Sequence, residues 1–353
     1  MKARKQIQIS GIGTIISPPF WVNPDFRNIT YTGGEKCLYN HTVPCNEGMV
    51  FDQSDRVVRI SYDGEIQPLC ERPNFDGVYG SGWATTNINA VIINHKDNFS
   101  LVSFDGTTKP LYSSSGRLRF SPLRACSKGP IFHFFSCPEK EKNDERWEFV
   151  FVSFEGESNT LYEGPRCFSN VVDQGLLICT ESNPYQNSGS VLLIEPDGTQ
   201  REIFKPPVGE NWLAPSYGFS WSGIHAVYNN HYHLIPFDGR KPASYSGRYQ
   251  SFGGCPKGLV VFLPNRLLVV PFEEDQPRPV WQFDSPGEAL GSCNAGIFIQ
   301  QEDDILLAPY DLSTPKTIVK GLPNKDAIHL DIRPTYKGLL IMHGVSSTMI
   351  EVK

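Results

Sequence analysis

The sequence lacks the features that mark exported, membrane-spanning and nucleic-acid-binding proteins. Its apolar runs, such as 147–154 and 259–263, are far shorter than the roughly 18 residues that a membrane helix needs. Near the N-terminus, polar residues interrupt the apolar ones before the hydrophobic stretch of a signal peptide forms. The charge is mildly acidic, with 32 Lys and Arg against 38 Asp and Glu, and no basic stripe attracts polyanions. We therefore expect a cytoplasmic protein with neither nucleic acid nor membrane as a partner.

Motifs of catalysis and metal binding are also scarce. The nine cysteines form no Cys-x-x-Cys pair, and an odd number without an export signal favours reduced thiols over disulfides. Neither the Gly-x-x-x-x-Gly-Lys-Ser/Thr phosphate loop nor the Gly-x-Ser-x-Gly nucleophile elbow occurs. His231 and His233 are two residues apart, but no third metal ligand has a fixed place beside them. The sequence predicts no metal and no cofactor, and it favours binding over catalysis.

Glycine and proline are abundant, with 31 and 28 residues, and this composition is typical of a turn-rich, all-β protein. A first marker recurs eight times: an apolar strand opened by Gly, or once by Asn89, with a small or β-branched residue three positions earlier. These earlier residues are Cys45, Thr86, Cys126, Val172, Ser220, Cys255, Cys293 and Thr335. Four of them are cysteines that share one repeat position with other small residues. We therefore expect these cysteines to pack between repeats as small buried side chains and to have no catalytic role.

A second marker follows each first one, namely an apolar strand that ends in an acidic turn. Five of these turns are Asp-Gly or Glu-Gly pairs, at 63–64, 105–106, 155–156, 197–198 and 238–239. Asp-Gly between two extended runs is a strong hairpin signal, because the type I′ turn that it favours needs positive φ at both central positions. We therefore expect a hairpin of this kind in each repeat.

The repeats are about 41 residues apart, which is the period of a four-stranded propeller blade. The eighth repeat stops before its fourth strand, whereas the chain begins with an unassigned strand at 5–10. This pattern predicts an all-β, eight-bladed β-propeller, a single domain over 1–353 in which residues 1–10 supply the closing strand of the last blade. Seven blades with a split repeat is the alternative. Residues 11–36, which contain the pair Pro18-Pro19, are expected to form an irregular connection into the first blade.

The endings of the third strands resemble those of a known repeat family. Ser-Phe-Asp105-Gly, Pro-Phe-Asp238-Gly and Pro-Asp197-Gly are similar to the endings of TolB-type, or PD40, repeats, and the chain resembles a β-propeller of the WD40-like superfamily. The resemblance covers nearly the whole chain and implies the fold alone, because many propellers share this hairpin signature. The Gly-His and Trp-Asp pairs of WD40 proteins are missing, as is the Ser-x-Asp-x-Gly-x-Thr-Trp box of sialidase-like propellers.

Function is expected where the repeats differ from one another. Arg119, Arg166 and Arg248 lie six or seven residues before the first marker of their repeats, which predicts one shared position near the mouth of a propeller channel. The corresponding position of another repeat holds Glu288. Three converging guanidinium groups would bind a carboxylate or phosphate through forked hydrogen bonds. Pairing of each arginine with a local acid, such as Glu163 or Glu288, is the simpler interpretation.

Three inserted segments lengthen the repeats, at 137–146, 182–189 and 206–215. In a four-stranded blade, the second-to-third and fourth-to-first connections leave from the same edge, so we expect these segments to lie together. Three aromatic residues lie in or beside them: Tyr185, Trp212 and Tyr217. Aromatic side chains on loops held by a rigid scaffold are typical anchors of protein interfaces.

These residues lead to two hypotheses about function. The first is a monomeric, non-catalytic scaffold that binds another protein through the face with the inserted segments and their aromatic residues. The alternative is a small-ligand-binding protein or enzyme that holds an anionic substrate at the channel mouth through the three arginines. A lectin is disfavoured, because the six tryptophans do not share one repeat position.

Overall fold

The computed structural model describes most of the chain, and the structural statements below concern these residues alone. They are 8–9, 13–32, 41–45, 48–52, 56–71, 83–84, 90–95, 98–113, 120–136, 146–172, 174–179, 190–205, 219–220, 223–228, 231–247, 251–255, 257–263, 265–274, 277–282, 287–310, 313–323, 330–335, 338–344 and 346–352.

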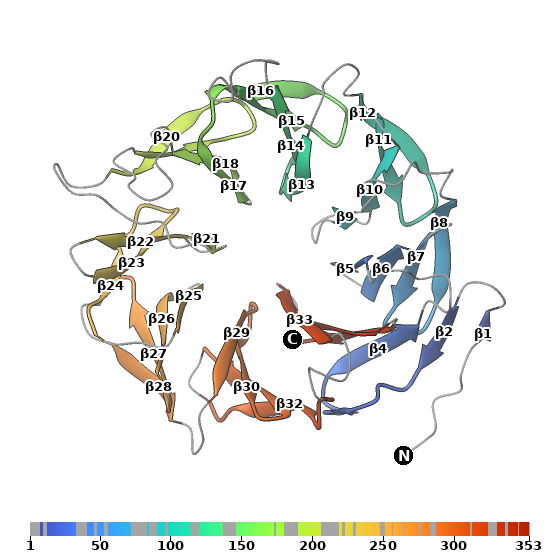
Figure 1. Ribbon diagram of the computed structural model, residues 1–353, viewed down its shortest axis with the longest axis vertical. Helices are drawn as coiled ribbons and strands as arrows, with labels where there is room; N and C mark the ends of the chain where they lie inside the picture. The colour runs from blue at the N-terminus through green and yellow to red at the C-terminus, as the bar shows by residue number, and fades with distance from the viewer. Residues whose placement is uncertain are drawn as a thin grey trace. The chain divides into compact units, whose positions relative to one another are not determined.

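All regular secondary structure among the described residues consists of β-strands (Figure 1). The strands form eight antiparallel sheets, of which six are four-stranded with their strands adjacent in chain order. The prediction of an all-β fold is confirmed. No helix in the described ranges is long and apolar enough to cross a membrane.

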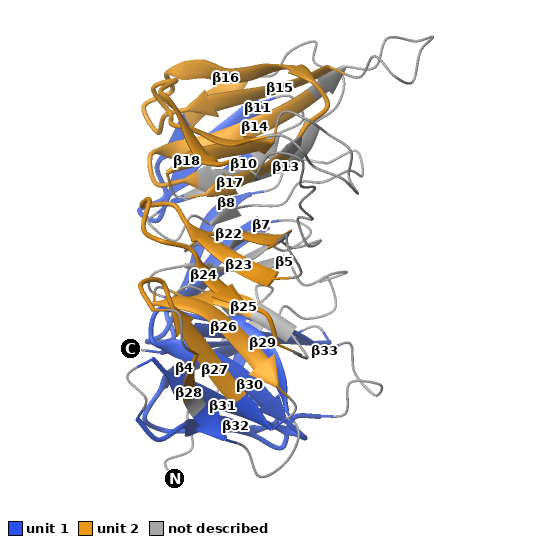
Figure 2. Ribbon diagram, turned by 90° about the vertical axis from the view of Figure 1, so that its left-hand side faces the viewer, with its two compact units in different colours: residues 1–109, 264–266, 280–353 blue, residues 110–263, 267–279 orange. Residues whose placement is uncertain are grey.

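The chain divides into two compact units, coloured separately in Figure 2. Unit 1 comprises 1–109, 264–266 and 280–353, and unit 2 comprises 110–263 and 267–279. Four sheets lie wholly or largely in unit 2. Their strands are β13 (Phe120–Cys126), β14 (Gly129–Ser136), β15 (Arg146–Val152), β16 (Ser158–Pro165); β17 (Phe168–Val172), β18 (Gly175–Cys179), β19 (Val191–Ile194), β20 (Gln200–Phe204); β21 (Phe219–Ser220), β22 (Gly223–Tyr228), β23 (His231–Pro236), β24 (Ala243–Tyr245); and β25 (Ser251–Cys255), β26 (Gly258–Leu263), β27 (Arg266–Pro271), β28 (Arg278–Gln282).

The other four sheets lie wholly or largely in unit 1. Two are four-stranded and consist of β5 (His41–Cys45), β6 (Gly48–Asp52), β7 (Arg56–Ser61), β8 (Ile66–Glu71); and β9 (Trp83–Ala84), β10 (Ala90–His95), β11 (Asn98–Ser103), β12 (Thr108–Ser113). A five-stranded sheet has the order β29 (Glu288–Ser292), β30 (Gly296–Gln301), β31 (Asp304–Pro309), β32 (Lys316–Lys320), β3 (Trp21–Val22). The six-stranded sheet, here called the closing sheet, has the order β1 (Gln8–Ile9), β2 (Gly13–Ile16), β4 (Arg27–Thr32), β35 (Ser346–Glu351), β34 (Gly338–His343), β33 (Leu330–Thr335).

Consecutive sheets of unit 2 pack face to face, and the strand β18 illustrates how. All five of its residues are buried. Leu176 and Ile178 belong to a cluster with the β13–β16 sheet, whereas Leu177 belongs to a cluster with the β21–β24 sheet. Alternate residues of a strand point to opposite faces, so a sheet between two others needs apolar residues at consecutive positions.

Hydrogen bonds between neighbouring sheets repeat with the same spacing as the sequence. The second residue of the fourth strand donates to the carbonyl oxygen that directly precedes the Asp of the next sheet's turn. Three such bonds join Gln67 Nε2 to Phe104 O (2.5 Å), Asn159 Nδ2 to Pro196 O (3.1 Å) and Arg201 Nη1 to Phe237 O (2.9 Å). Each fourth strand of these pairs is therefore held in register with the hairpin of its neighbour.

The hairpins lie at the predicted places, but their turns are not of type I′. At the first turn, Gly64 N–H donates to Ser61 O (3.0 Å) and Ser61 N–H donates to Glu65 O (2.9 Å). Gly64 has a φ of 86°, whereas Glu302 is the one non-glycine residue with positive φ in the described part of the chain. These turns are therefore three-residue hairpins in which Gly alone takes the left-handed conformation, because an Asp side chain would be strained there.

The glycine of the first marker, which opens the second strand of its sheet, is required because the third strand passes very close to it. A Cβ atom on Gly258 would overlap the carbonyl oxygen of Val270, and one on Gly48 would overlap that of Ile60. The same overlap would occur at the equivalent Gly129, Gly175, Gly223, Gly296 and Gly338. The recurring glycine therefore marks a backbone contact within each of these sheets.

The prediction for the closing strand was wrong in its residues. The strand that pairs with β35 is β4, through six residue pairs, whereas Gln8 and Ile9 of the predicted segment 1–10 pair only with β2. Tyr31 of β4 is fully buried and Thr30 is 1% exposed, so both faces of this strand are covered. A strand in that place needs side chains that tolerate burial on both faces, which the alternating polar residues at 6–10 do not provide.

The expectation that 11–36 is irregular was also wrong, because this segment contains β2, β3 and β4. The Pro18-Pro19 pair lies in the short connection between β2 and β3. Two prolines exclude a continuous strand there, but they permit a chain that leaves one sheet and joins another.

We predict that Gly258→Ala lowers the free energy of unfolding by about 2–3 kcal/mol, because the new methyl group would overlap the carbonyl oxygen of Val270. Gly253→Ala, on the neighbouring strand β25, is the matched control, since nothing lies within 4 Å of a Cβ built there. Urea unfolding followed by tryptophan fluorescence measures both changes. Equal losses in the two variants would contradict the prediction.

Candidate functional site

Of the seven predicted site residues, the structure describes Arg166 and Glu288. Both are exposed. Arg166 belongs to unit 2 and Glu288 to unit 1, so each is considered in its own surroundings. The other five lie outside the described residues: Arg119, Tyr185, Trp212, Tyr217 and Arg248.

The strand pairing of unit 2 defines one edge from which the long connections leave. Arg146 at the start of β15 is opposite Ser136 on one side and Pro165 on the other. In the next sheet, Phe168 at the start of β17 is opposite Cys179 at the end of β18. The chain therefore leaves for 137–145, 166–167 and 180–190 from the same edge of these sheets, which we call the loop edge.

The Arg166 side chain lies over an aromatic cluster at the loop edge. Its guanidinium carbon is 5.6 Å from the centre of the Trp147 ring, a distance at which a cation is attracted to the ring face. His133 lies 4.3 Å from Trp147 and is stacked on Phe149 at 4.4 Å, measured between ring centres. These four side chains therefore form one cluster, in which Arg166 is exposed and Phe149 is buried.

A hydrogen bond fixes the chain just before Arg166. Tyr162 Oη donates to Pro165 O (2.8 Å), and the tyrosine ring folds over Gly164 so closely that a Cβ there would collide with it. The backbone that carries Arg166 is thus held against the end of β16. This local arrangement explains how a residue in a two-residue connection keeps its place over Trp147.

Two titratable groups beside Arg166 are held neutral. Burial raises the pKa of the Cys167 thiol to about 12, although a hydrogen bond with Tyr162 opposes this rise. Burial also raises the pKa of Tyr162 to about 12. The reactive form of a cysteine is the thiolate, which is a minute fraction of Cys167 near neutral pH. Neither group therefore supplies a nucleophile or a general base here.

Glu288 begins β29, where it pairs with Gln300 across the sheet. The side chain is exposed at the edge of the β29–β32 sheet, and no ion pair of Glu288 occurs among the described residues. The suggestion that Glu163 or Glu288 neutralises an arginine therefore stays a prediction.

The described histidines and cysteines form no metal centre. No group of three or more His, Cys, Asp or Glu residues that could hold a metal occurs in the described ranges. His231 and His233 are on one face of β23 with ring centres 6.0 Å apart, and His233 Nδ1 is 2.7 Å from Ser244 Oγ. His225 on the neighbouring strand β22 is buried, and burial lowers its pKa to about 4.

Sequence reasoning missed Trp147 and His133 as parts of this cluster. Trp147 directly follows the inserted segment 137–146, and this position was a usable signal for a residue at the loop edge. His133 carries no such signal, because its contact with Trp147 depends on the register between β14 and β15.

Comparison with known proteins gives structural likeness alone. No family model and no curated protein sequence matches the chain. A virginiamycin B lyase from Staphylococcus aureus is 12% identical, with 93% of this chain and 100% of that chain covered and a TM-score of 0.44. A streptogramin B lyase is 12% identical, covers 93% and 98% of the two chains, and has a TM-score of 0.42. A puromycin hydrolase is 11% identical, covers 84% and 48%, and has a TM-score of 0.39. Likeness at this level carries no conclusion about chemistry.

We predict that Cys167 in the folded protein reacts with iodoacetamide at pH 8 at least a hundredfold more slowly than in the urea-unfolded chain, because it is buried and protonated. Mass spectrometry of the modified peptide measures the rate. The half-buried Cys70 serves as the internal comparison. Modification of Cys167 as fast as that of Cys70 would show that its burial has been misjudged.

Acid is predicted to destabilise the fold through His225. Its folded-state pKa of about 4 lies below the ordinary value of 6.5, so the stability linked to the neutral ring is complete above pH 6.5 and is lost as the pH falls toward 4. This loss amounts to about 2–3 kcal/mol. Urea unfolding at pH 7.5 and 4.5 should show a smaller difference in His225→Gln than in wild type. An unchanged difference would refute the assignment to His225.

Proposed function

We propose that this protein is an eight-bladed β-propeller that acts as a non-catalytic platform and binds another protein at the loop edge of unit 2. Eight separate sheets among the described residues support eight blades over seven. Face-to-face packing of consecutive sheets within each unit, together with the pairing of β4 with β35, supports closure by an N-terminal strand.

The observation that carries the binding proposal is the Arg166 guanidinium over the half-buried Trp147 at the loop edge. Tryptophan and arginine are the residue types most enriched among the anchors of protein interfaces. The Trp147 ring also packs against the rings of His133 and Phe149, so little of its side-chain entropy is lost when a partner binds. The inserted segment 137–146 joins the sheet directly beside this pair.

Two further observations support binding rather than catalysis. Cys167 and Tyr162, which lie close to Arg166 in the chain, have pKa values that burial raises to about 12, so neither is activated as a nucleophile or a base near pH 7. The arginine itself lies over an indole ring, an arrangement typical of a recognition surface. The alternative function is capture of a small anion by three arginines, of which Arg166 is the one that lies within the described residues.

Affinity capture with the purified full chain tests the proposal. Arg166→Ala should weaken capture of a specific partner at least tenfold, because it removes an interface anchor. Arg240→Ala is the matched control: Arg240 lies over Phe272 in the same way, at 4.4 Å, but next to an Asp-Gly turn at the opposite edge of its sheet. That variant should bind like wild type, and circular dichroism should show both variants folded.

Equal capture by wild type and Arg166→Ala would overturn the proposed surface. A thermal-shift screen with phosphate, citrate and nucleotides separates the two functions. Stabilisation of wild type by one of these anions, lost in Arg166→Ala, would favour the small-ligand alternative. No response to any anion, together with Arg166-dependent capture of a protein, is the outcome that the platform predicts.

A further inference from the structure

Residues 13–26 cross from one sheet of unit 1 to the next, and we call them the N-terminal strap. At one end, β2 pairs with β4 in the closing sheet through three residue pairs. At the other end, β3 pairs with β32 through two. Asn23 adds two hydrogen bonds to β32, from its backbone N–H to Ile318 O (2.9 Å) and from Nδ2 to Thr317 O (2.8 Å). Few backbone bonds therefore hold the strap to the β29–β32 sheet.

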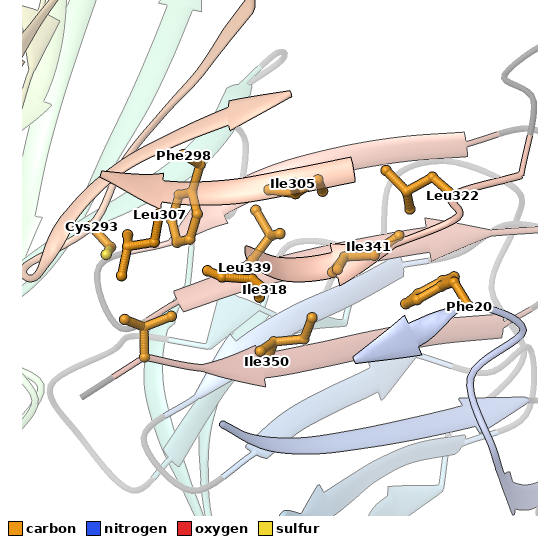
Figure 3. Packing of buried hydrophobic residues seen from close by; sticks show 12 residues of the cluster. Phe20, Cys293, Phe298, Ile305, Leu307, Ile318, Leu322, Leu339, Ile341 and Ile350 are labelled. Carbon is orange, nitrogen blue, oxygen red and sulfur yellow. The ribbon is translucent and has the colours of Figure 1, made fainter. Parts of the chain in front are cut away.

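Phe20 is the buried anchor of the strap. Figure 3 shows its ring among the side chains of the closing sheet and the β29–β32 sheet, including Ile341 and Leu322. It is 6% exposed, whereas the adjacent Trp21 is 39% exposed and lies 5.8 Å from the Lys320 ammonium. Burial of Phe20 therefore holds the strap together with the few backbone bonds beside it.

A histidine meets Phe20 at the end of β34. The ring centre of His343 is 5.6 Å from that of Phe20, with the two rings at 79°. His343 is 7% exposed, and its Nε2 is 3.1 Å from Thr348 Oγ1. Thr348 Oγ1 is in turn 2.8 Å from Thr30 Oγ1 of β4. The imidazole thus lies between a buried hydroxyl pair and the aromatic anchor of the strap.

We propose that the strap is an acid-released latch: it stays seated while His343 is neutral, and it lifts from β32 when the imidazole gains a proton. An imidazolium needs water or a counter-ion, and His343 is almost fully buried and forms no ion pair among the described residues. The strands β33 and β35 each pair with β34 through six residue pairs. Phe20, which no strand pairing holds, is therefore the neighbour that gives way.

The charged groups on the surrounding elements do not compensate the imidazolium. Among the described residues they are Asp25 on the strap, Arg27 on β4, Lys316 and Lys320 on β32, Asp331 and Arg333 on β33, and Glu351 on β35. Arg27 pairs with Glu351 (3.4 Å), and Asp331 pairs with Arg333 (2.7 Å). Burial lowers the pKa of His343 below its ordinary 6.5, so the neutral ring stabilises the seated strap above that pH and this stabilisation fades below it.

Release of the strap would uncover the outer edge of β32, a row of backbone groups able to pair with a strand of another molecule. The latch is therefore a regulatory device that makes the exposure of this strand edge depend on pH. It is separate from the loop edge, because it lies wholly in unit 1.

Hydrogen exchange of the full chain, read by mass spectrometry at pH 7.5 and 5.0 as protection factors, tests the latch. Protection of peptides covering 13–26 should fall about ten- to thirtyfold at pH 5.0. This is the range expected when release of the strap is coupled to uptake of one proton by a histidine with an ordinary pKa near 6.5 in the open state. In His343→Gln, which keeps a hydrogen-bonding side chain but does not titrate, the strap should respond less than twofold. His225→Gln supplies the control for global stability, because it lacks the other histidine that is predicted to destabilise the fold in acid. In that variant the strap should respond as in wild type, and peptides from β26 should not change.

In His225→Gln, loss of protection in the strap and in β26 together would overturn the proposal, since it would indicate global unfolding. An equal response in wild type and His343→Gln would overturn it as well. If His343→Gln does not fold, the wild type still tests the latch. The pH midpoint of the His343 Cε1–H signal in an NMR titration should equal the pH midpoint of strap release. Separate midpoints would refute the latch.

Discussion

Burial of both faces of each inner sheet is the constraint on which the rest of the structure depends. A four-stranded sheet that is apolar on both faces needs another layer packed against each face. Here the neighbouring sheets of the same unit supply these layers. Strands such as β18 and β34 therefore consist entirely of buried residues. The glycine that opens many of these strands lets the neighbouring carbonyl approach, so the sheets stay compact where the strands begin.

This packing leaves the sheet edges as the places where chemistry varies. At the strand ends that carry the Asp-Gly turns, the same hairpin recurs from sheet to sheet. In it, Gly takes the left-handed conformation, and a side chain of the preceding sheet donates a hydrogen bond to the turn. The loop edges carry residues that occur once, such as Trp147 and Arg166. A surface for recognition on such a scaffold therefore gains its specificity at the loop edges, while the core keeps it rigid.

The N-terminal segment solves a different problem, that of an exposed strand edge. The sheet that ends at β35 would present an open edge, and β4 covers it with a strand that is buried on both faces. The strap then continues to β32 and places Phe20 between two sheets. A single histidine, His343, shares this buried space, which makes the seat of the strap sensitive to a proton in a way that its apolar neighbours are not.

The sequence by itself determined the strands and hairpins, because glycines, Asp-Gly turns and apolar runs act through contacts that are near in the chain. It also placed Arg166 beside long connections, since antiparallel order decides which strand ends share an edge. Tertiary structure decided what local patterns do not encode. Both Gln6-Ile-Gln-Ile and Arg27-Asn-Ile-Thr-Tyr have the pattern of a strand that could pair with β35. Only the burial available on both faces of β35's partner selects the second. The cluster of His133 with Trp147 likewise depends on cross-strand register, which long-range pairing sets.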